Sequence, residues 1–136
     1  MKNTIVIKVG SNSLLDKDNN LNQAFFQKIV EVVKGIQARG KLPLLVLSGA
    51  VATGKADVPG LTSYGARAAR GQLIVSAFMH QLGQAAQVKF GQFLISRQDI
   101  IERERYVALQ KTFQECLGAG LIPLINENDT TASAQA

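Results

Sequence analysis

Four short runs of the chain are wholly or mostly apolar, and the stretches between them carry apolar residues at helical spacing. The runs cover residues 4–7, 42–47, 90–96 and 121–125. Each is too short for a buried helix, and an unbroken apolar run is typical of a parallel strand that is covered on both faces. The pattern therefore predicts an α/β fold, in which a parallel sheet lies between two layers of helices as a three-layer sandwich.

The helical stretches have recognisable ends. They are expected over residues 21–39, 64–89 and 106–117. Asn20 or Asn22 is the expected cap of the first helix, and Gly40 follows its last turn in a position where glycine is favoured. The second helix should be interrupted near Gly71 and again near Gly83. Its expected apolar face consists of Leu73, Ile74, Ala77, Phe78 and Leu82.

The composition fits a single globular domain. Of the 136 residues, 46% are hydrophobic and 18% are charged, which argues against disorder. The net charge of +5 is compatible with anionic partners such as nucleotides, phosphates, carboxylates or RNA. With two tyrosines, no tryptophan and no dense run of lysine and arginine, a nucleic-acid platform is disfavoured.

Single residues with reactive side chains have structural interpretations. Cys116 is the only cysteine, which excludes an internal disulfide and fits a reducing cytoplasm, and its apolar neighbours indicate a core position. His80 has no partner at metal-ligand spacing, so we expect no metal site there. The mixed charges of residues 97–105 are typical of a solvated helix start. No membrane span or signal peptide is recognisable, and we expect a cytoplasmic protein without membrane contact.

The first strand ends in a segment suited to binding phosphate. Lys8 is followed by Gly10 and Ser11. Glycine allows a sharp turn and close approach to a ligand, backbone N–H groups and hydroxyls can hold phosphate oxygens, and the lysine adds positive charge. The order of residues is not that of the nucleotide-binding loop in which the lysine follows two glycines. An ordinary strand end and turn is the alternative interpretation.

Two later strands end in similarly unusual segments. The second strand leads into the small-residue segment 48–55, expected as a loop before a helix start, and the fourth leads into the polar, acidic segment 126–131. The latter could hold an ammonium group, a metal or a polar substrate, or be only a turn. Because ligands collect at the carboxyl ends of parallel strands, the three segments together predict one joint site.

Several motifs match those of one known family in order and spacing. The segments are residues 8–14, 48–54, 71–72, 91–99, 104–106 and 122–129. They resemble the amino-terminal half of the glutamate 5-kinases, within the amino acid kinase superfamily. The combination of Ser48-Gly49-Ala50 with Asn126-Glu127-Asn128-Asp129 is the specific part, since related carbamate, uridylate, aspartate and N-acetylglutamate kinases usually carry different loops at the second strand.

The resemblance implies transfer of the γ-phosphoryl group of ATP to the side-chain carboxylate of L-glutamate, the first step of proline biosynthesis. It also implies Mg²⁺, a cytoplasmic location and a homo-oligomer of the full-length form. Lys8 would be catalytic, stabilising charge on the transferring phosphoryl group, while Gly10 and Ser11 would line the phosphate path. The implied glutamate-binding residues are Ser48, Gly49, Ala50, Asn126 and Asp129, the last of these through the α-amino group.

The sequence also departs from the family pattern. Tyr64-Gly65-Ala66 stands where the family usually has Lys-Gln-Ala, and Ala108 stands where an asparagine is frequent. The family's later Gly-Asp-Asn-Asp segment and nucleotide-binding half, with a second important lysine, do not occur in residues 1–136. We therefore expect these residues to form the glutamate-binding part of an amino acid kinase domain that alone binds ATP poorly and has no useful kinase turnover.

Two other functions are compatible with the sequence. The first is a stand-alone, non-catalytic glutamate-binding or regulatory protein derived from the kinase. The second is a basic nucleic-acid-binding module, favoured only by the net charge.

Overall fold

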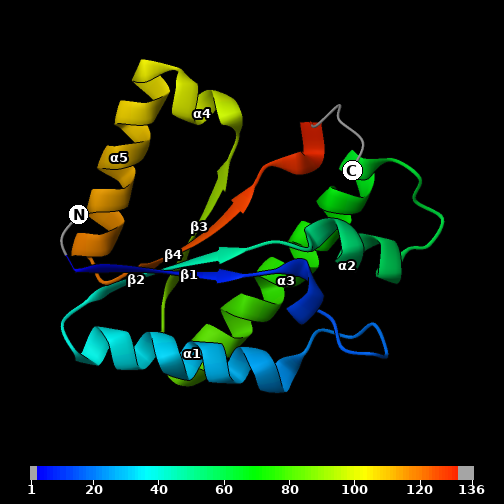
Figure 1. Cartoon of the computed structure of the whole chain (residues 1–136), viewed down its shortest axis with the longest axis horizontal. Coiled ribbons are helices and arrows are strands. Elements are labelled where there is room, and N and C mark those ends of the chain that lie inside the picture. Colours follow the sequence, from blue (N-terminus) through cyan, green and yellow to red (C-terminus); the bar gives the residue numbers. More distant parts are fainter. Residues whose placement is uncertain (1–2, 132–136) are drawn as a thin grey trace.

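The computed structural model describes residues 3–131 and confirms the parallel α/β architecture (Figure 1). The strands are β1 (Thr4–Val9), β2 (Leu42–Leu47), β3 (Phe90–Ile95) and β4 (Ile122–Glu127). They form one sheet in the order β1-β2-β4-β3, and every neighbouring pair is parallel. β1 and β4 extend two residues beyond the expected runs, so Lys8, Asn126 and Glu127 lie within strands.

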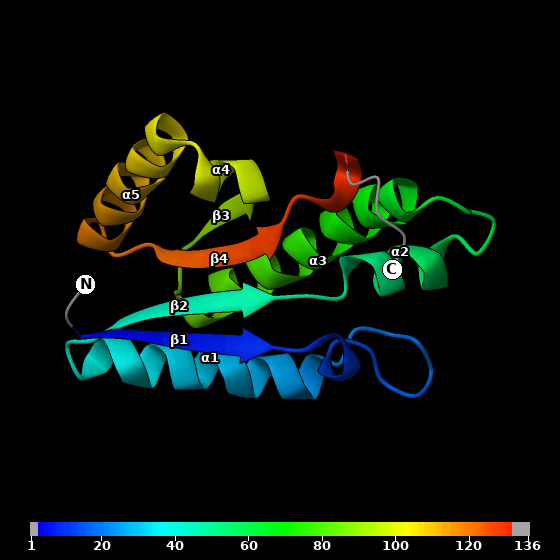
Figure 2. The ribbon, with the colours of Figure 1, turned by 45° about the horizontal axis from the view of Figure 1, so that its top comes forward.

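Helices cover both faces of the sheet (Figures 1 and 2). They are α1 (Gln23–Ala38), α2 (Ala50–Asp57), α3 (Tyr64–Ala86), α4 (Arg97–Ile101) and α5 (Arg103–Gly118), with short 3₁₀ helices η1 (Ser11–Ser13) and η2 (Asp129–Thr131). α1 and α3 lie on one face and α5 on the other, because the step from β3 back to β4 reverses direction and crossovers are right-handed. Within residues 3–131, no helix is long and apolar enough to cross a membrane.

Each face of the sheet has its own hydrophobic core. Under α1 and α3, Phe26 and Met79 are fully buried, and Phe26 meets the ring of Phe78 edge-on at 5.6 Å. Under α5, the rings of Phe93 and Phe113 are stacked 4.2 Å apart. The central strands β2 and β4 are largely buried on both faces, which is the reason that they read as apolar runs, whereas the edge strand β1 leaves Val6 62% exposed.

The first helix follows its expected ends closely. The side chain of Asn22 accepts a hydrogen bond from the Phe25 N–H, so Asn22 rather than Asn20 is the cap. Gly40 has a φ of +75°, a backbone conformation that favours glycine. Residues 48–55, expected as a loop, are mostly the helix α2 itself, which begins at Ala50.

α3 differs from the expectation because it runs without interruption. Gly71 and Gly83 do not break it: both are buried, and a Cβ at either would meet backbone oxygen of another segment. The expected apolar face is confirmed for Phe78 and Leu82, which pack against the core, but not for Leu73. Val75 and Met79 are buried, whereas Leu73 is 64% exposed.

Candidate functional site

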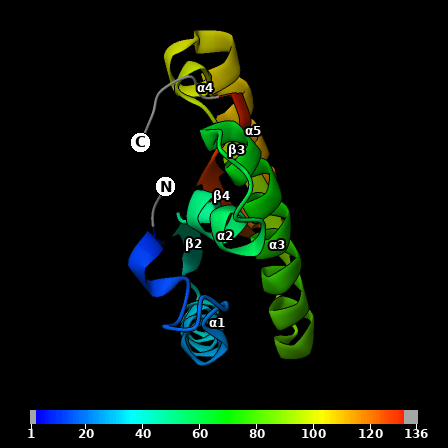
Figure 3. The ribbon, with the colours of Figure 1, turned by 90° about the vertical axis from the view of Figure 1, so that its right-hand side faces the viewer.

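The carboxyl ends of all four strands point to the same edge of the sheet, where η1, α2 and η2 follow (Figure 2). Viewed from that edge, α2 stands in front of the sheet (Figure 3). A hollow of about 540 Å³ opens there, and Lys8, Ser48 and Asn126 line it together. The structure therefore brings one residue from each of the three predicted segments to one place.

Two cations and one carboxylate line this hollow. They are Lys8 of β1, Arg97 at the start of α4 and Glu127 at the end of β4. Among the described residues, none of the three forms an ion pair. Apolar side chains also line the hollow, among them Val46, Ile100 and Ile125. A partly apolar lining with an excess of positive charge suits a small anionic ligand.

Ser48 joins the first two segments. Its hydroxyl donates to the carbonyl oxygen of Val9 at 3.2 Å. The next residue, Gly49, has a φ of +105°, and a Cβ there would lie 2.7 Å from the Leu14 side chain and 3.3 Å from the Cα of Ser11. Gly49 thus allows α2 to start directly against η1, a tight turn that other residues would strain.

Asn126 is held by hydrogen bonds on both sides of its amide. Its Nδ2 donates to Oε1 of Gln72 in α3 at 2.6 Å, and its Oδ1 accepts from the backbone N–H of Glu127 at 2.8 Å. Asn126 therefore enters the hollow as an oriented group.

Two acidic side chains and a tyrosine gather where β4 passes into η2. Burial raises the pKa of the Asp129 carboxyl above its ordinary value of 3.8, and the neighbouring Glu127 raises it further. Burial, together with the charges of Asp129 and Glu127, also raises the pKa of the Tyr64 hydroxyl. A cationic group placed here would favour the ionised form of Asp129.

The other predicted site residues do not line the main hollow. Ala50 and Asp129 border an adjacent crevice of about 10 Å³, which is too small for an amino acid. Gly49 and Ser11 lie against each other at the foot of α2. Gly10 has a φ of −74° and open space around its Cα, so its backbone does not require glycine, contrary to the expected sharp turn. Its contact with a ligand stays a prediction.

Sequence reasoning missed the placement of two residues. Both lie in the motifs 91–99 and 71–72, but the charges around Arg97 indicate a solvated helix start, and nothing in the sequence assigns a role to Gln72. Arg97 reaches the hollow because β3 lies beside β4, so that the end of β3 opens onto the same edge. A polar residue directly after a buried strand was the available signal for Arg97.

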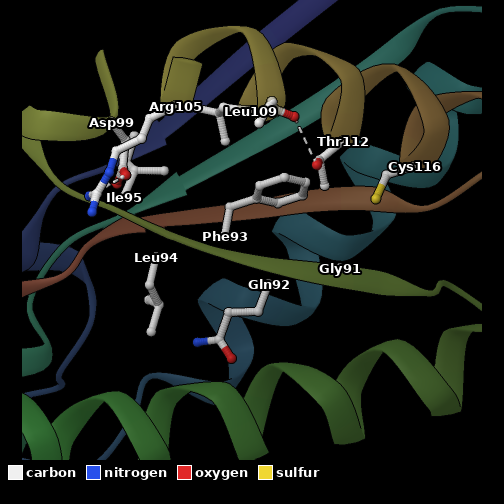
Figure 4. Close-up of a pocket in the computed structure, with 11 residues that line it drawn as sticks. Gly91, Gln92, Phe93, Leu94, Ile95, Asp99, Arg105, Leu109, Thr112 and Cys116 are labelled. Carbon is white, nitrogen blue, oxygen red and sulfur yellow. Dashed lines mark hydrogen bonds and ion pairs between the residues drawn. The ribbon is translucent and has the colours of Figure 1, made fainter. Parts of the chain in front are cut away.

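A second hollow, of about 460 Å³, lies away from these residues between β3 and α5 (Figure 4). Phe93 points into it, and the Asp99–Arg105 ion pair, at 3.3 Å, stands at one end. Cys116 lies at the other end and is partly buried. None of the predicted site residues lines this hollow, so the candidate site remains the hollow at the carboxyl ends of the strands.

Between residues 3 and 131 the structure holds no cluster of three or more histidine, cysteine or carboxylate side chains arranged to hold a metal ion. A divalent ion held mainly by the phosphates of a nucleotide needs only one or two carboxylates. Glu127 lines the hollow and Asp129 the adjacent crevice, so the residues fit such an ion but provide no complete cage for one.

A parallel α/β sheet with an oriented amide, two cations and an acidic loop at its carboxyl edge defines a class of protein that binds small, charged ligands there. The comparisons with known proteins give the family. Residues 3–135 match the amino acid kinase family, and the chain belongs to that family.

Its curated relatives include proteins named glutamate 5-kinase, as the motifs indicated. The chain is 35% identical to one from Rhizobium etli over 96% of its own length, and 36% identical to one from Nostoc punctiforme over 97%. It is 37% identical to glutamate 5-kinase 1 of Bacillus subtilis over 96% of its length. The matches span only 35–38% of the length of these relatives.

Proposed function

We propose that the chain provides the glutamate-binding part of a glutamate 5-kinase. The observation that carries the proposal is the convergence of Lys8, Ser48, Arg97 and Asn126 on one hollow at the carboxyl edge of the sheet. L-Glutamate carries two carboxylates and one ammonium group, which matches two cations beside an acidic loop. The relatives named glutamate 5-kinase support this reaction, and a kinase implies ATP as the second substrate.

The proposed reaction begins with the side-chain carboxylate of glutamate. One of its oxygens forms a bond to the γ-phosphorus of ATP, the bond from that phosphorus to the β,γ-bridging oxygen breaks, and ADP leaves with the electron pair. The product is glutamyl 5-phosphate, the first intermediate of proline biosynthesis. Such a transfer depends mainly on positioning and charge stabilisation rather than on a covalent protein group.

The residues of this chain have separate tasks in that reaction. Lys8 would stabilise the charge on the transferring phosphoryl group, and Gly10 and Ser11 would line the phosphate path. Arg97, at the other side of the hollow, would bind a carboxylate of glutamate, and Asp129 its α-ammonium group. Mg²⁺ accompanying ATP would neutralise phosphate charge, with Glu127 or Asp129 as the available carboxylates.

Because the chain spans 35–38% of the length of its relatives, we assign only the glutamate side to residues 1–136. Most of the ATP contacts would come from other residues of an amino acid kinase domain, in a cytoplasmic homo-oligomer. Calorimetric titration with L-glutamate tests the assigned part. Binding that is weakened by Ser48→Ala and by Asp129→Ala supports the proposal, and absence of binding to the folded protein contradicts it.

The alternative is a non-catalytic glutamate-binding or regulatory protein, which would use the same hollow. Capture of the native polypeptide from source cells, followed by intact mass spectrometry, separates the two. A species of twice this length or more favours the kinase. A species near 14.6 kDa favours the binding protein, and a glutamate-dependent ATPase assay should then show no kinase turnover.

A further inference from the structure

We propose that Gln72 is a positioning residue that fixes the side-chain amide of Asn126 in a single orientation for ligand binding. The inference rests on the proposed function, because it concerns how that site recognises glutamate. It starts from a hydrogen-bonded chain that runs from β3 through α3 to β4 and consists of Gln92, Ser76, Gln72 and Asn126.

Ser76 lies in the middle of this hydrogen-bonded chain, and its hydroxyl has all its hydrogen-bonding capacity in use. Its single proton is donated to the backbone oxygen of Gln72 at 2.7 Å. Its oxygen accepts from Nε2 of Gln92 at 2.6 Å and from Nε2 of Gln72 at 3.0 Å. A hydroxyl has one proton and two lone pairs, so Ser76 can act toward both glutamines only as an acceptor.

This fixed role determines the orientation of Gln72. Its NH₂ group must face Ser76, and its carbonyl oxygen Oε1 therefore faces the other way, toward Asn126. Rotation of the Gln72 amide by 180° would place Oε1 against the oxygen of Ser76 and the NH₂ group against that of Asn126. Both hydrogen bonds would be replaced by repulsive contacts.

Asn126 then has one orientation as well. Its Nδ2 must donate to Gln72, at 2.6 Å, which leaves Oδ1 to accept from the Glu127 N–H at 2.8 Å. One amide proton and one lone pair of Asn126 remain for a ligand. Without Gln72, the Asn126 amide would be held only by the Glu127 N–H, and a ligand would have to immobilise it further at a cost in affinity.

Gln92, at the β3 end of the hydrogen-bonded chain, connects these side chains to the sheet. Figure 4 shows Gln92 directed from β3 away from Phe93 and toward α3. Gln72 itself is partly buried and also borders the crevice shared by Ala50 and Asp129. Gln72 therefore stands between the segment after β2 and the segment after β4, and its hydrogen bond to Asn126 connects α3 with β4.

The test is a double-mutant cycle with Gln72→Met, which keeps the length of the side chain but removes the amide, and Asn126→Ala. Glutamate affinity is measured by calorimetry. We expect Gln72→Met to weaken binding by about 3- to 10-fold, the value of one hydrogen bond, and to have less than a twofold further effect in the Asn126→Ala background. Gln81→Met, on the exposed face of α3, is the matched control and should leave affinity unchanged. Full additivity of the two effects would overturn the proposal.

A second measurement does not depend on glutamate binding. The side-chain amide protons of Asn126 are followed by NMR in the ligand-free protein. The proton that is donated to Gln72 should lose its downfield shift and move toward the value of an exposed asparagine amide in Gln72→Met, but not in Gln81→Met. Unchanged Asn126 resonances in a folded Gln72→Met protein would overturn the positioning role. Failure of the wild-type chain to bind glutamate, with the NMR effect intact, would instead contradict the proposed function.

Discussion

Gly71 of α3 lies directly against the carbonyl group of Ala50 at the start of α2, and no space for a side chain exists between them. A Cβ on Gly71 would overlap the Ala50 carbonyl and would come within 2.8 Å of the Gly54 nitrogen. A Cβ on Gly54 would in turn overlap the carbonyl oxygen of Arg67. The two helices therefore touch through their backbones, and this contact places the Ser48-Gly49-Ala50 segment against α3.

Gly71→Ala should consequently destabilise the fold, although alanine is the better helix former. Overpacking of a buried contact costs about 1–3 kcal/mol, and here the obstacle is backbone rather than a flexible side chain. Gly35→Ala in α1 is the matched control. Gly35 is exposed with open space around it, so the substitution should stabilise the protein by about 0.5–1 kcal/mol. Urea unfolding measures the free energy of unfolding, which should fall for Gly71→Ala and rise for Gly35→Ala. Equal changes in the two variants would contradict the backbone contact.

Gly65 controls the position of the acidic segment. A Cβ on Gly65 would lie 2.7 Å from the carbonyl oxygen of Thr130 and 3.7 Å from that of Asp129. Gly65→Ala should therefore push η2 away from α3 and weaken glutamate binding by several-fold. The free energy of unfolding should fall by about 1–3 kcal/mol, as for other overpacked contacts. Calorimetric titration measures the affinity. Undiminished binding would show that η2 does not contribute to the site. Tyr64 and Gly65, which replace the usual Lys-Gln of the family, thus lie beside the acidic segment.

The raised pKa of Asp129 predicts that stability depends on pH. The folded chain holds this proton more tightly than the unfolded chain does, so the contribution of Asp129 to stability declines as the pH rises from 3.8 through the raised value. Asp129→Asn should remove that decline and make the protein more stable at neutral pH. The same variant should bind glutamate about 10-fold more weakly or worse, because it loses a charged partner for the ammonium group.

Thermal unfolding at several pH values between 4 and 7, compared for wild type and variant, measures this effect. Asp18→Asn, which removes an exposed carboxylate in the turn before α1, provides the control for the loss of one negative charge. An Asp129→Asn protein that is both less stable at neutral pH and unaltered in glutamate affinity would contradict the assignment of Asp129.

The fold was predictable from the sequence because burial on both faces leaves an apolar run at the central strands β2 and β4, and the edge strands β1 and β3 are still mostly apolar. The ends of β1 and β4 were missed for the same reason. Lys8, Asn126 and Glu127 continue the strands, but they lie at the edge where side chains meet a hollow instead of a core. The unbroken course of α3 was also missed, since a glycine that serves a contact with another helix looks locally like an interruption.

The site was predictable in outline and not in its contacts. Small and polar residues after successive strands indicated which segments meet, because parallel strands share one edge. The participation of Arg97 depends on the strand order, in which β3 neighbours β4, and local sequence does not encode that order. The pairing of Gln72 with Asn126 joins residues 54 positions apart, and helical spacing alone gives no indication of it.

Lys8 and Arg97 line the same hollow but should differ in what they contribute. Arg97→Ala should weaken glutamate binding by about 10- to 100-fold, as expected for a charge-assisted hydrogen bond to a carboxylate, and Arg97→Lys should restore only part of it because lysine lacks the paired N–H groups. Lys8→Ala should change glutamate affinity little and should lower the turnover of the native polypeptide, assayed as glutamyl hydroxamate formation, by about 100- to 1000-fold.

Arg103→Ala, which removes an exposed arginine at the start of α5 outside the hollow, is the control and should affect neither glutamate affinity nor turnover. If Lys8→Ala weakened glutamate binding as much as Arg97→Ala while turnover at saturating glutamate stayed normal, both cations would be substrate ligands, and the phosphoryl-stabilising role of Lys8 would be wrong.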